Sequence, residues 1–87
     1  PAVDLAVCLS IASSFLNKSL GPEMVVLGEV GLSGEVRMVS QLEKRISEAG
    51  KLGFKRALVP RTKTKVKVRN CEIISVNSLG EAISKVL

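Results

Sequence analysis

The run at residues 3–15, VDLAVCLSIASSF, constrains the fold of this sequence most, because it is apolar on nearly every face. Such a run predicts a helix that is buried on most of its sides, rather than an amphipathic helix on a surface. Serines interrupt it, and no stretch of 18 apolar residues occurs in the sequence, so no membrane span is predicted. Other elements, or another chain, must therefore cover this helix.

The segments that follow alternate between strand and helix patterns. Strands are predicted at four short apolar or β-branched runs, 24–30, 35–39, 54–59 and 71–76. The Gly-Leu-Ser-Gly loop at 31–34 tolerates positive φ and joins the first two strands as a hairpin. Ser-x-x-Glu capping boxes at 40–43 and 78–81 open two further helices, since the serine and the glutamate satisfy opposite unpaired amides. The order α-β-β-α-β-β-α predicts an α+β fold with α/β character.

Composition limits both the size and the chemistry of the chain. Its 87 residues provide one small domain, and the absence of histidine excludes His-dependent hydrolases, zincins and imidazole switches. Two phenylalanines are too few for a platform that stacks single-stranded bases. Cys8 and Cys71 have no metal-ligand spacing, so we expect two reduced core thiols, with one disulfide as the alternative.

The net charge of +5 is unevenly distributed along the chain. Eight of the 13 basic residues, and no acidic residue, fall in the interval 51–69, and the remainder of the chain carries a net charge of −3. These eight form the basic segment: Lys51, Lys55, Arg56, Arg61, Lys63, Lys65, Lys67 and Arg69. The protein is therefore a weakly acidic body with one basic segment.

Within the basic segment, charged residues alternate with Thr or Val from 61 to 69, which is the period of an extended strand. The five cations of that strand would share one face, about 6.6 Å apart. Such a face is also typical of edge strands that resist aggregation and of ordinary exposed strands. A row of one sign repels itself unless an anion is present, so the pattern favours phosphate. We expect all eight basic residues to contact phosphate groups through counterion release, without sequence specificity.

Several motifs are similar to a known family. The stretches PAVDLAVCLSIASS, GEVGLSGEVR, GFKRALVP and CEIISVNSLGEAI closely resemble the carboxy-terminal Lon-protease-like domain of the bacterial RadA (Sms) family. The resemblance covers almost the whole chain. It implies a Lon-protease-like, or ribosomal-protein-S5-domain-2-like, fold, of which residues 1–87 form a part that lacks the earlier strands of the domain.

The resemblance also implies a parent protein with functions outside this chain. That parent has an amino-terminal zinc finger and a RecA-like ATPase, and it acts as a ring on recombination intermediates in DNA repair. ATP, Mg²⁺ and zinc would belong to those domains, and we expect no cofactor or metal in this chain. The implied location is the bacterial cytoplasm, with a plant chloroplast or mitochondrion as the alternative.

Proteases of the Lon family use a Ser-Lys dyad, in which the lysine activates the serine hydroxyl. The serine lies in a Gly-Pro-Ser-Ala-Gly segment and the lysine in a Gly-Gly-Leu-Lys segment. Pro1 aligns with the proline of the first segment, so Ala2 occupies the nucleophile position. Leu42 aligns with the leucine of the second, so Glu43 occupies the lysine position. Neither residue can perform this chemistry, and the resemblance therefore implies a pseudo-protease without catalytic residues.

Two other patterns have ordinary structural interpretations. Gly28, Gly31 and Gly34 have the spacing of a phosphate-binding loop, but they join two predicted strands and are interpreted as hairpin glycines. Asp4 is either an N-cap of the first helix or a contact to a neighbouring subunit, and the sequence leaves both open.

Three functions are compatible with the sequence. The first is a non-catalytic module that contacts DNA through the basic segment and supports ring assembly. The second is a purely structural oligomerisation scaffold, and the third is a peptidase with another nucleophile, Ser10 or Cys8. The apolar flank at Leu5–Leu16 predicts self-association as a dimer or ring, because its apolar side chains would otherwise be exposed to water.

Overall fold

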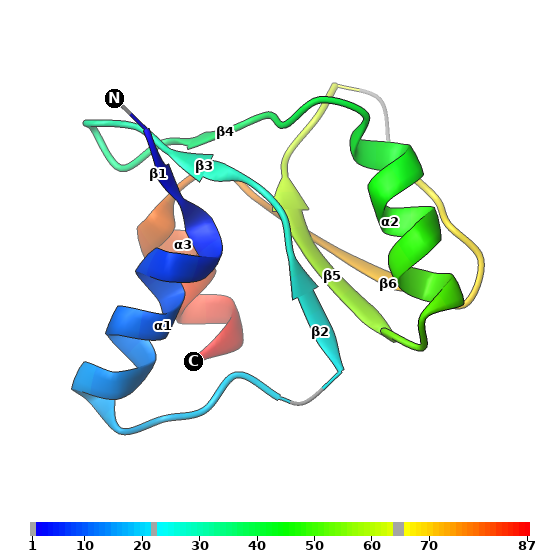
Figure 1. The fold of residues 1–87 in the computed structure, drawn as a ribbon. Helices are drawn as coiled ribbons and strands as arrows, with labels where there is room; N and C mark the ends of the chain where they lie inside the picture. Colours follow the sequence, from blue (N-terminus) through cyan, green and yellow to red (C-terminus); the bar gives the residue numbers. More distant parts are fainter. Residues whose placement is uncertain (1, 22, 64–65) are drawn as a thin grey trace.

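The computed structural model describes residues 2–21, 23–63 and 66–87, and there two helices cover one face of a three-stranded sheet while a third covers the other (Figure 1). The elements are β1 (Val3–Asp4), α1 (Leu5–Leu16), β2 (Met24–Val26), β3 (Glu29–Val30), β4 (Val36–Arg37), α2 (Leu42–Lys51), β5 (Arg56–Pro60), β6 (Glu72–Val76) and α3 (Leu79–Val86). A second, smaller sheet has the order β1-β3-β4. The predicted α+β class is confirmed.

The larger sheet has the strand order β2-β5-β6, and both pairs are parallel. Its central strand, β5, is buried on both faces. Leu58 belongs to the core cluster beneath α1 and α3, whereas Ala57 and Val59 belong to the cluster beneath α2. A parallel strand covered on both faces is encoded as a continuous apolar run, and this explains why no polar residue interrupts 57–60.

The strand expected at 24–30 consists instead of two strands in two sheets. β2 pairs with β5 in the larger sheet, and β3 pairs antiparallel with β4 in the smaller one. Gly28 lies between them at φ 149°, and a Cβ there would come within 3.2 Å of Val36 Cγ1. A glycine therefore lets the chain leave one sheet and enter the other. The predicted hairpin is confirmed for β3 and β4, with Gly34 N donating to Gly31 O (3.0 Å) across the turn.

Helix α1 begins two residues later than predicted, because the first residues of the apolar run form β1 and pair with β3. Asp4 caps the helix, since its carboxylate accepts a hydrogen bond from Val7 N (3.2 Å). The helix ends at Asn17, which takes the left-handed conformation with φ 55°. The N-cap interpretation of Asp4 is confirmed.

The expectation that this helix is buried on most sides is wrong for the part of the chain described. Leu5 and Leu9 are fully buried in the core, but Ile11 is 65% exposed and Phe15 is 89% exposed. α1 lies at the outside of the layer that it shares with α3, and only its inner face meets the sheet and that helix (Figure 1). Its outer apolar face therefore still needs a covering surface.

The two predicted capping boxes have different outcomes. The box of α3 is confirmed, because Glu81 N donates to Ser78 Oγ (3.0 Å) and Asn77 N donates to Glu81 Oε1 (2.7 Å). The box of α2 does not form, because the helix starts one residue later, with Gln41 at the N-cap in the left-handed conformation (φ 54°). Glu43 still lies in the first turn, where an acid favours the helix dipole.

Cys8 and Cys71 are both free thiols. Cys8 packs against the cluster beneath α1 and α3, and Cys71 belongs to the cluster beneath α2, so the sheet separates them. Burial raises the pKa of the Cys71 thiol and keeps it protonated. The prediction of reduced thiols is confirmed, the core position is confirmed for Cys71 whereas Cys8 is half-buried, and the disulfide alternative is wrong for this fold.

Candidate nucleic-acid interface

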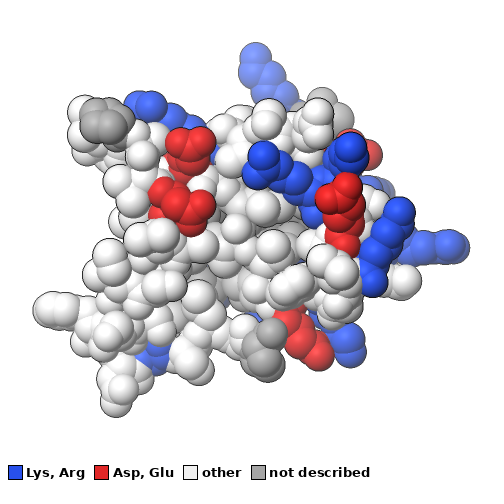
Figure 2. All heavy atoms as spheres, in the orientation of Figure 1, with Lys and Arg blue, Asp and Glu red and all other residues white. Residues whose placement is uncertain are grey.

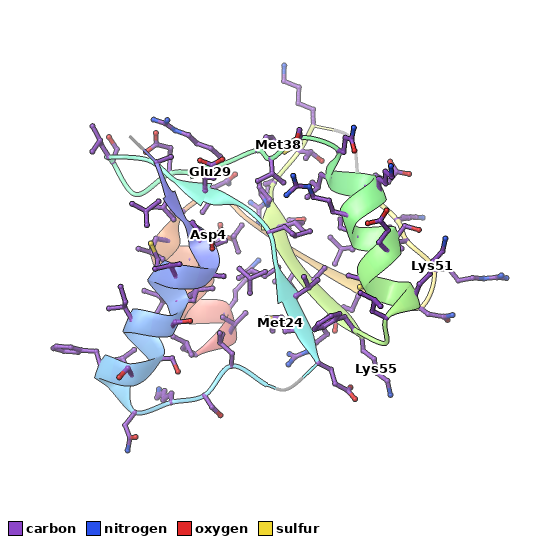
Figure 3. The ribbon with its side chains drawn as sticks, viewed as in Figure 1. Asp4, Met24, Glu29, Met38, Lys51 and Lys55 are labelled. Carbon is purple, nitrogen blue, oxygen red and sulfur yellow. The ribbon has the colours of Figure 1, made fainter. Side chains whose placement is uncertain are left out.

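The basic segment lies beside α2 and the ends of β5. Lys51 is the last residue of α2, Lys55 precedes β5 and Arg56 opens it; Figure 3 shows Lys51 and Lys55 extending from this end of the ribbon. The other five basic residues belong to the β5–β6 connection, which we define as residues 61–71. In Figure 2 the blue side chains gather on the α2 side with a few acids among them, and the α1 side is largely white. The two sides of the sheet thus differ in charge.

The extended strand predicted at 61–69 is wrong for its described parts. Residues 61–63 and 66–69 contain no strand of the sheets, and their one regular pairing is an isolated antiparallel bridge between Val68 and Cys71. The cations of these parts therefore do not form one straight row. Lys65, which the prediction also includes, lies outside the described residues.

The connection is instead held against α2 by its valines. Val66 and Val68 are half-buried against the core cluster beneath α2, while Lys67 and Arg69 are exposed. Asn70, at φ 62°, then turns the chain back toward β6. The alternation of the sequence still separates apolar from basic side chains here, but it does so without the ladder of an edge strand.

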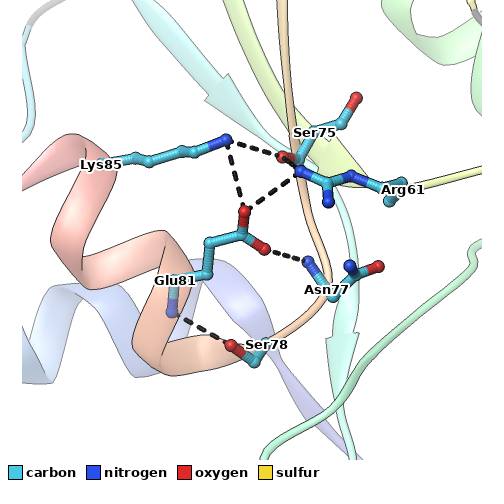
Figure 4. Close-up of polar contacts among 6 residues, drawn as sticks. All are labelled: Arg61, Ser75, Asn77, Ser78, Glu81 and Lys85. Atoms are coloured by element: carbon cyan, nitrogen blue, oxygen red, sulfur yellow. Dashed lines mark hydrogen bonds and ion pairs between the residues drawn. The ribbon is translucent and has the colours of Figure 1, made fainter.

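Arg61 forms an ion pair with an acid on α3. Its Nη2 donates to Glu81 Oε2 (3.1 Å) and to Ser75 O (3.0 Å), and Lys85 Nζ lies 3.3 Å from the same carboxylate oxygen (Figure 4). The hydrogen bond from Asn77 N, followed by Lys85 and Arg61, holds the pKa of Glu81 below its usual value. Glu81 is therefore ionised at neutral pH and balances the charge of Arg61.

Lys55 and Arg56 are also partly engaged. Lys55 Nζ lies 3.9 Å from Glu23 Oε2, and Arg56 is half-buried with its guanidinium close to Gly21. Of the basic segment's described residues, four are exposed and form no ion pair with residues 2–21, 23–63 or 66–87: Lys51, Lys63, Lys67 and Arg69. We call these four the open cations. Within the basic segment they are the side chains most available to an external anion.

Two of the open cations meet at one surface pocket. Lys51 and Arg69, at opposite ends of the basic segment, line a pocket of about 240 Å³ between α2 and the turn of the connection. Ser47 and Asn70 line it too, and sequence analysis missed both. The spacing of Ser47 and Lys51, four residues apart on a predicted helix, was the signal that could have placed Ser47 there. Asn70 gave no comparable signal.

A larger pocket, of about 440 Å³, lies on the other side of the sheet between α1 and α3. Its lining is apolar throughout: Cys8, Ile11, Ala12, Phe15, Leu16, Leu79 and Ile83. None of these lining residues is a base that could activate the Cys8 thiol, as a peptidase with Cys8 as its nucleophile would require.

In the described part of the chain, no helix is long and apolar enough to cross a membrane. Nor do three or more Cys, Asp or Glu residues of that part gather where they could hold a metal ion.

Comparison with known proteins places the chain in a family. The model of the family described as subunit ChlI of Mg-chelatase matches residues 1–63. The chain belongs to this family. It is also 45% identical over its whole length to DNA repair protein RadA of Synechocystis sp., and 47% identical over 85 residues to DNA repair protein RadA of Bacillus subtilis. These alignments cover 17% and 19% of the two relatives, and 95% of this chain in the second case.

A third relative, DNA repair protein RadA of Halalkalibacterium halodurans, is 57% identical over 60 residues, which are 69% of this chain and 13% of that protein. The predicted relationship to RadA is confirmed, and the chain is a RadA-related domain. It spans about a fifth or less of the length of these relatives.

In this RadA-related chain the two positions aligned with the protease dyad lie in different segments. Ala2 is half-buried just before β1, and Glu43 is exposed in the first turn of α2. Glu43 lines a surface pocket together with Gln41 and Lys44. A methyl group and a carboxylate occupy these positions, and the Lon-protease-like assignment itself stays a prediction.

Proposed function

We propose that the chain is a non-catalytic, pseudo-protease module of a RadA-like DNA repair protein, and that it supports DNA contact and ring assembly during the processing of recombination intermediates. The observation that carries the proposal is the set of open cations beside α2, which have no ion pair in the described chain. Any ATP hydrolysis would belong to other parts of such a protein. The relatives named DNA repair protein RadA support the biological setting.

The DNA backbone is the partner that suits this surface best. Exposed lysines and arginines bind phosphates through counterion release, which needs no base-specific geometry. The surface offers charge but no stacking platform, because Phe54 is half-buried and Phe15 lies on α1. A sequence-independent contact to duplex DNA therefore fits both the charges of this surface and its lack of an exposed aromatic group. Several modules in one ring would strengthen a weak individual contact.

The test is the salt dependence of duplex binding by the full-length protein. The variant K63Q/K67Q removes two open cations, and K18Q/K85Q removes the same charge from α1's C-terminal side and from α3. Each lost phosphate contact reduces the magnitude of the negative slope of log K against log salt by about 0.9, so for K63Q/K67Q we expect a reduction of about 1.8 per contacting subunit. The control should keep the wild-type slope.

Equal slopes in the two variants would show that the DNA contact does not lie on this surface. If self-association were retained in that case, the chain would be a purely structural scaffold.

Self-association through the outer face of α1 is the second part of the proposal. Ile11 and Phe15 are exposed beside the apolar pocket between α1 and α3, in a region with almost no charge. A soluble surface that exposes large apolar groups together is typical of an interaction site. This observation favours assembly with further copies in a dimer or ring.

We infer a bacterial cytoplasmic location from the bacterial sources of the relatives compared above. We further infer that the chain has no peptidase activity, because Ala2 and Glu43 replace the serine and lysine of the dyad. Peptide turnover that is lost on mutation of Cys8 or Ser10 would overturn this second inference.

A further inference from the structure

The pocket lined by Lys51 and Arg69 has two walls that the fold itself holds in place. On the first wall, Ser47 and Lys51 are one helical turn apart and share a face of α2. Gly50 also lines the pocket, and a Cβ there would be 3.7 Å from Arg69 O, which is an ordinary contact distance, so the connection lies against the helix at this point.

The second wall is the turn that contains Arg69 and Asn70. A bridge between Val68 and Cys71 closes this turn, and both of these residues pack into the core cluster beneath α2. Asn70 is held in the left-handed conformation at φ 62°. Because the core and the bridge position both walls, the pocket does not depend on a ligand to form, and a preformed site binds with less ordering cost.

Gly50 and Val68 complete the lining of this pocket, and its four polar side chains are suited to an anion. Lys51 and Arg69 bring two positive charges, Ser47 and Asn70 offer a hydroxyl and an amide as donors, and the lining contains no acid. The negative end of the α2 dipole explains a cation at position 51, but it does not explain Arg69 and Asn70 on the opposite wall. Two like charges at one pocket are favourable when an anion lies between them.

We propose that this pocket binds one phosphate group of the DNA backbone. The proposal rests on the DNA contact proposed above and gives it a defined anchoring point. Arg69 and Lys51 supply charge to the phosphate oxygens, and Asn70 and Ser47 donate neutral hydrogen bonds to them. The remaining open cations, Lys63 and Lys67, contact neighbouring phosphates without a pocket.

The test changes Asn70 and uses Asn17 as its matched control. Both are asparagines in the left-handed conformation, which aspartate tolerates, but Asn17 ends α1 on the other side of the sheet. In N70D an acid of the same shape faces the phosphate, so we expect duplex binding by the full-length protein to weaken about tenfold more than in N17D. N70G keeps the positive φ and removes only the amide, so we expect about a fivefold loss relative to N17G.

A second measurement uses inorganic phosphate as the probe. At matched ionic strength, phosphate should displace the duplex from the wild-type protein more effectively than chloride does, and N70D should lose this difference. Thermal unfolding of each variant confirms that it is folded.

Equal affinities of N70D and N17D for the duplex would overturn the proposal that this pocket binds a phosphate. Equal displacement by phosphate and chloride in the wild-type protein would overturn it too. In that case a reduced salt slope of K63Q/K67Q would still support the DNA contact. An unchanged slope in K63Q/K67Q would overturn the proposed function itself.

Discussion

The two helical layers on opposite faces of the larger sheet expose different kinds of surface to solvent. α2 buries Leu42, Ile46 and Ala49 and turns a charged face outward, beside the open cations. α1 buries Leu5 and Leu9 but turns a second apolar face outward. The same sheet therefore supports one surface suited to phosphates and another suited to protein.

This difference teaches that burial and function are separable within each helix. The inner residues of α1 and α2 hold the sheet between them, and their loss should unfold the chain. The outer residues contribute little to the fold, and their loss should act on a partner. The predictions below test this separation, starting with the largest expected effect.

The first prediction compares the inner and outer faces of α1. Leu9 is fully buried, so L9A should lower the free energy of unfolding by about 3 kcal/mol through lost burial and a cavity. Ile11 is 65% exposed, so I11S should change it by no more than about 0.5 kcal/mol. Chemical denaturation measures both. An I11S variant as unstable as L9A would mean that the outer face is already packed in the single chain.

The second prediction concerns assembly through the outer face. The double variant I11S/F15S replaces two exposed apolar side chains, and self-association of the full-length protein should weaken about a hundredfold. S10A/S14A is the control, because it changes two exposed residues of the same helix without loss of apolar surface. Light scattering over a concentration series gives the molar mass. Equal molar masses of the two variants would show that self-association does not use this face.

The third prediction compares the two capping patterns. S78A removes a side chain that accepts a hydrogen bond from Glu81 N, so it should cost about 1 kcal/mol of stability. S40A alters the pattern before α2, where the N-cap is Gln41 and no side chain caps the helix, so it should be close to neutral. The free energies of unfolding of the two variants, measured with denaturant, show which of the two capping boxes is formed. An S40A variant as destabilised as S78A would refute the assignment at α2.

The fourth and smallest prediction concerns acid. The pKa of Glu81 is held below its ordinary value of 4.5 in the folded chain, mainly by the hydrogen bond from Asn77 N. Its contribution to stability is therefore present above about pH 4.5 and is lost as the pH falls through the lower folded-state value. E81Q keeps the capping box and removes the charge, so its unfolding temperature should fall less steeply between pH 5 and about pH 3 than that of the wild-type protein.

E48Q, at an exposed position on α2, is the control for this acid titration. An E81Q variant with the acid sensitivity of the wild-type protein would show that the Glu81 network does not couple to folding.

Local patterns predicted much of the fold because local chemistry determines it. The β3–β4 hairpin follows from its glycines, the α3 box from Ser78 and Glu81, and the free thiols from apolar surroundings. The strand at 24–30 was predicted as one element because its apolar run is continuous. The division at Gly28 depends on which sheet each half joins, and that is a tertiary property.

The candidate site was predictable in its location but not in its geometry. The interval 51–69 identified the cations, and its alternation indicated a strand. In the described parts of this interval, packing of Val66 and Val68 beneath α2 overrides that propensity. Long-range contacts then pair Arg61 with Glu81 and bring Arg69 close to α2, and no local pattern in the sequence reports such contacts.

Hydrogen–deuterium exchange of the full-length protein, with and without duplex DNA, tests the separation of the two surfaces most directly. The amides of 66–70 lie outside the β5–β6 ladder, so they report contact sensitively. We predict that duplex DNA slows exchange at 66–70 and leaves the exchange of Leu5–Leu16 unchanged. Slower exchange across Leu5–Leu16 with no change at 66–70 would contradict the account.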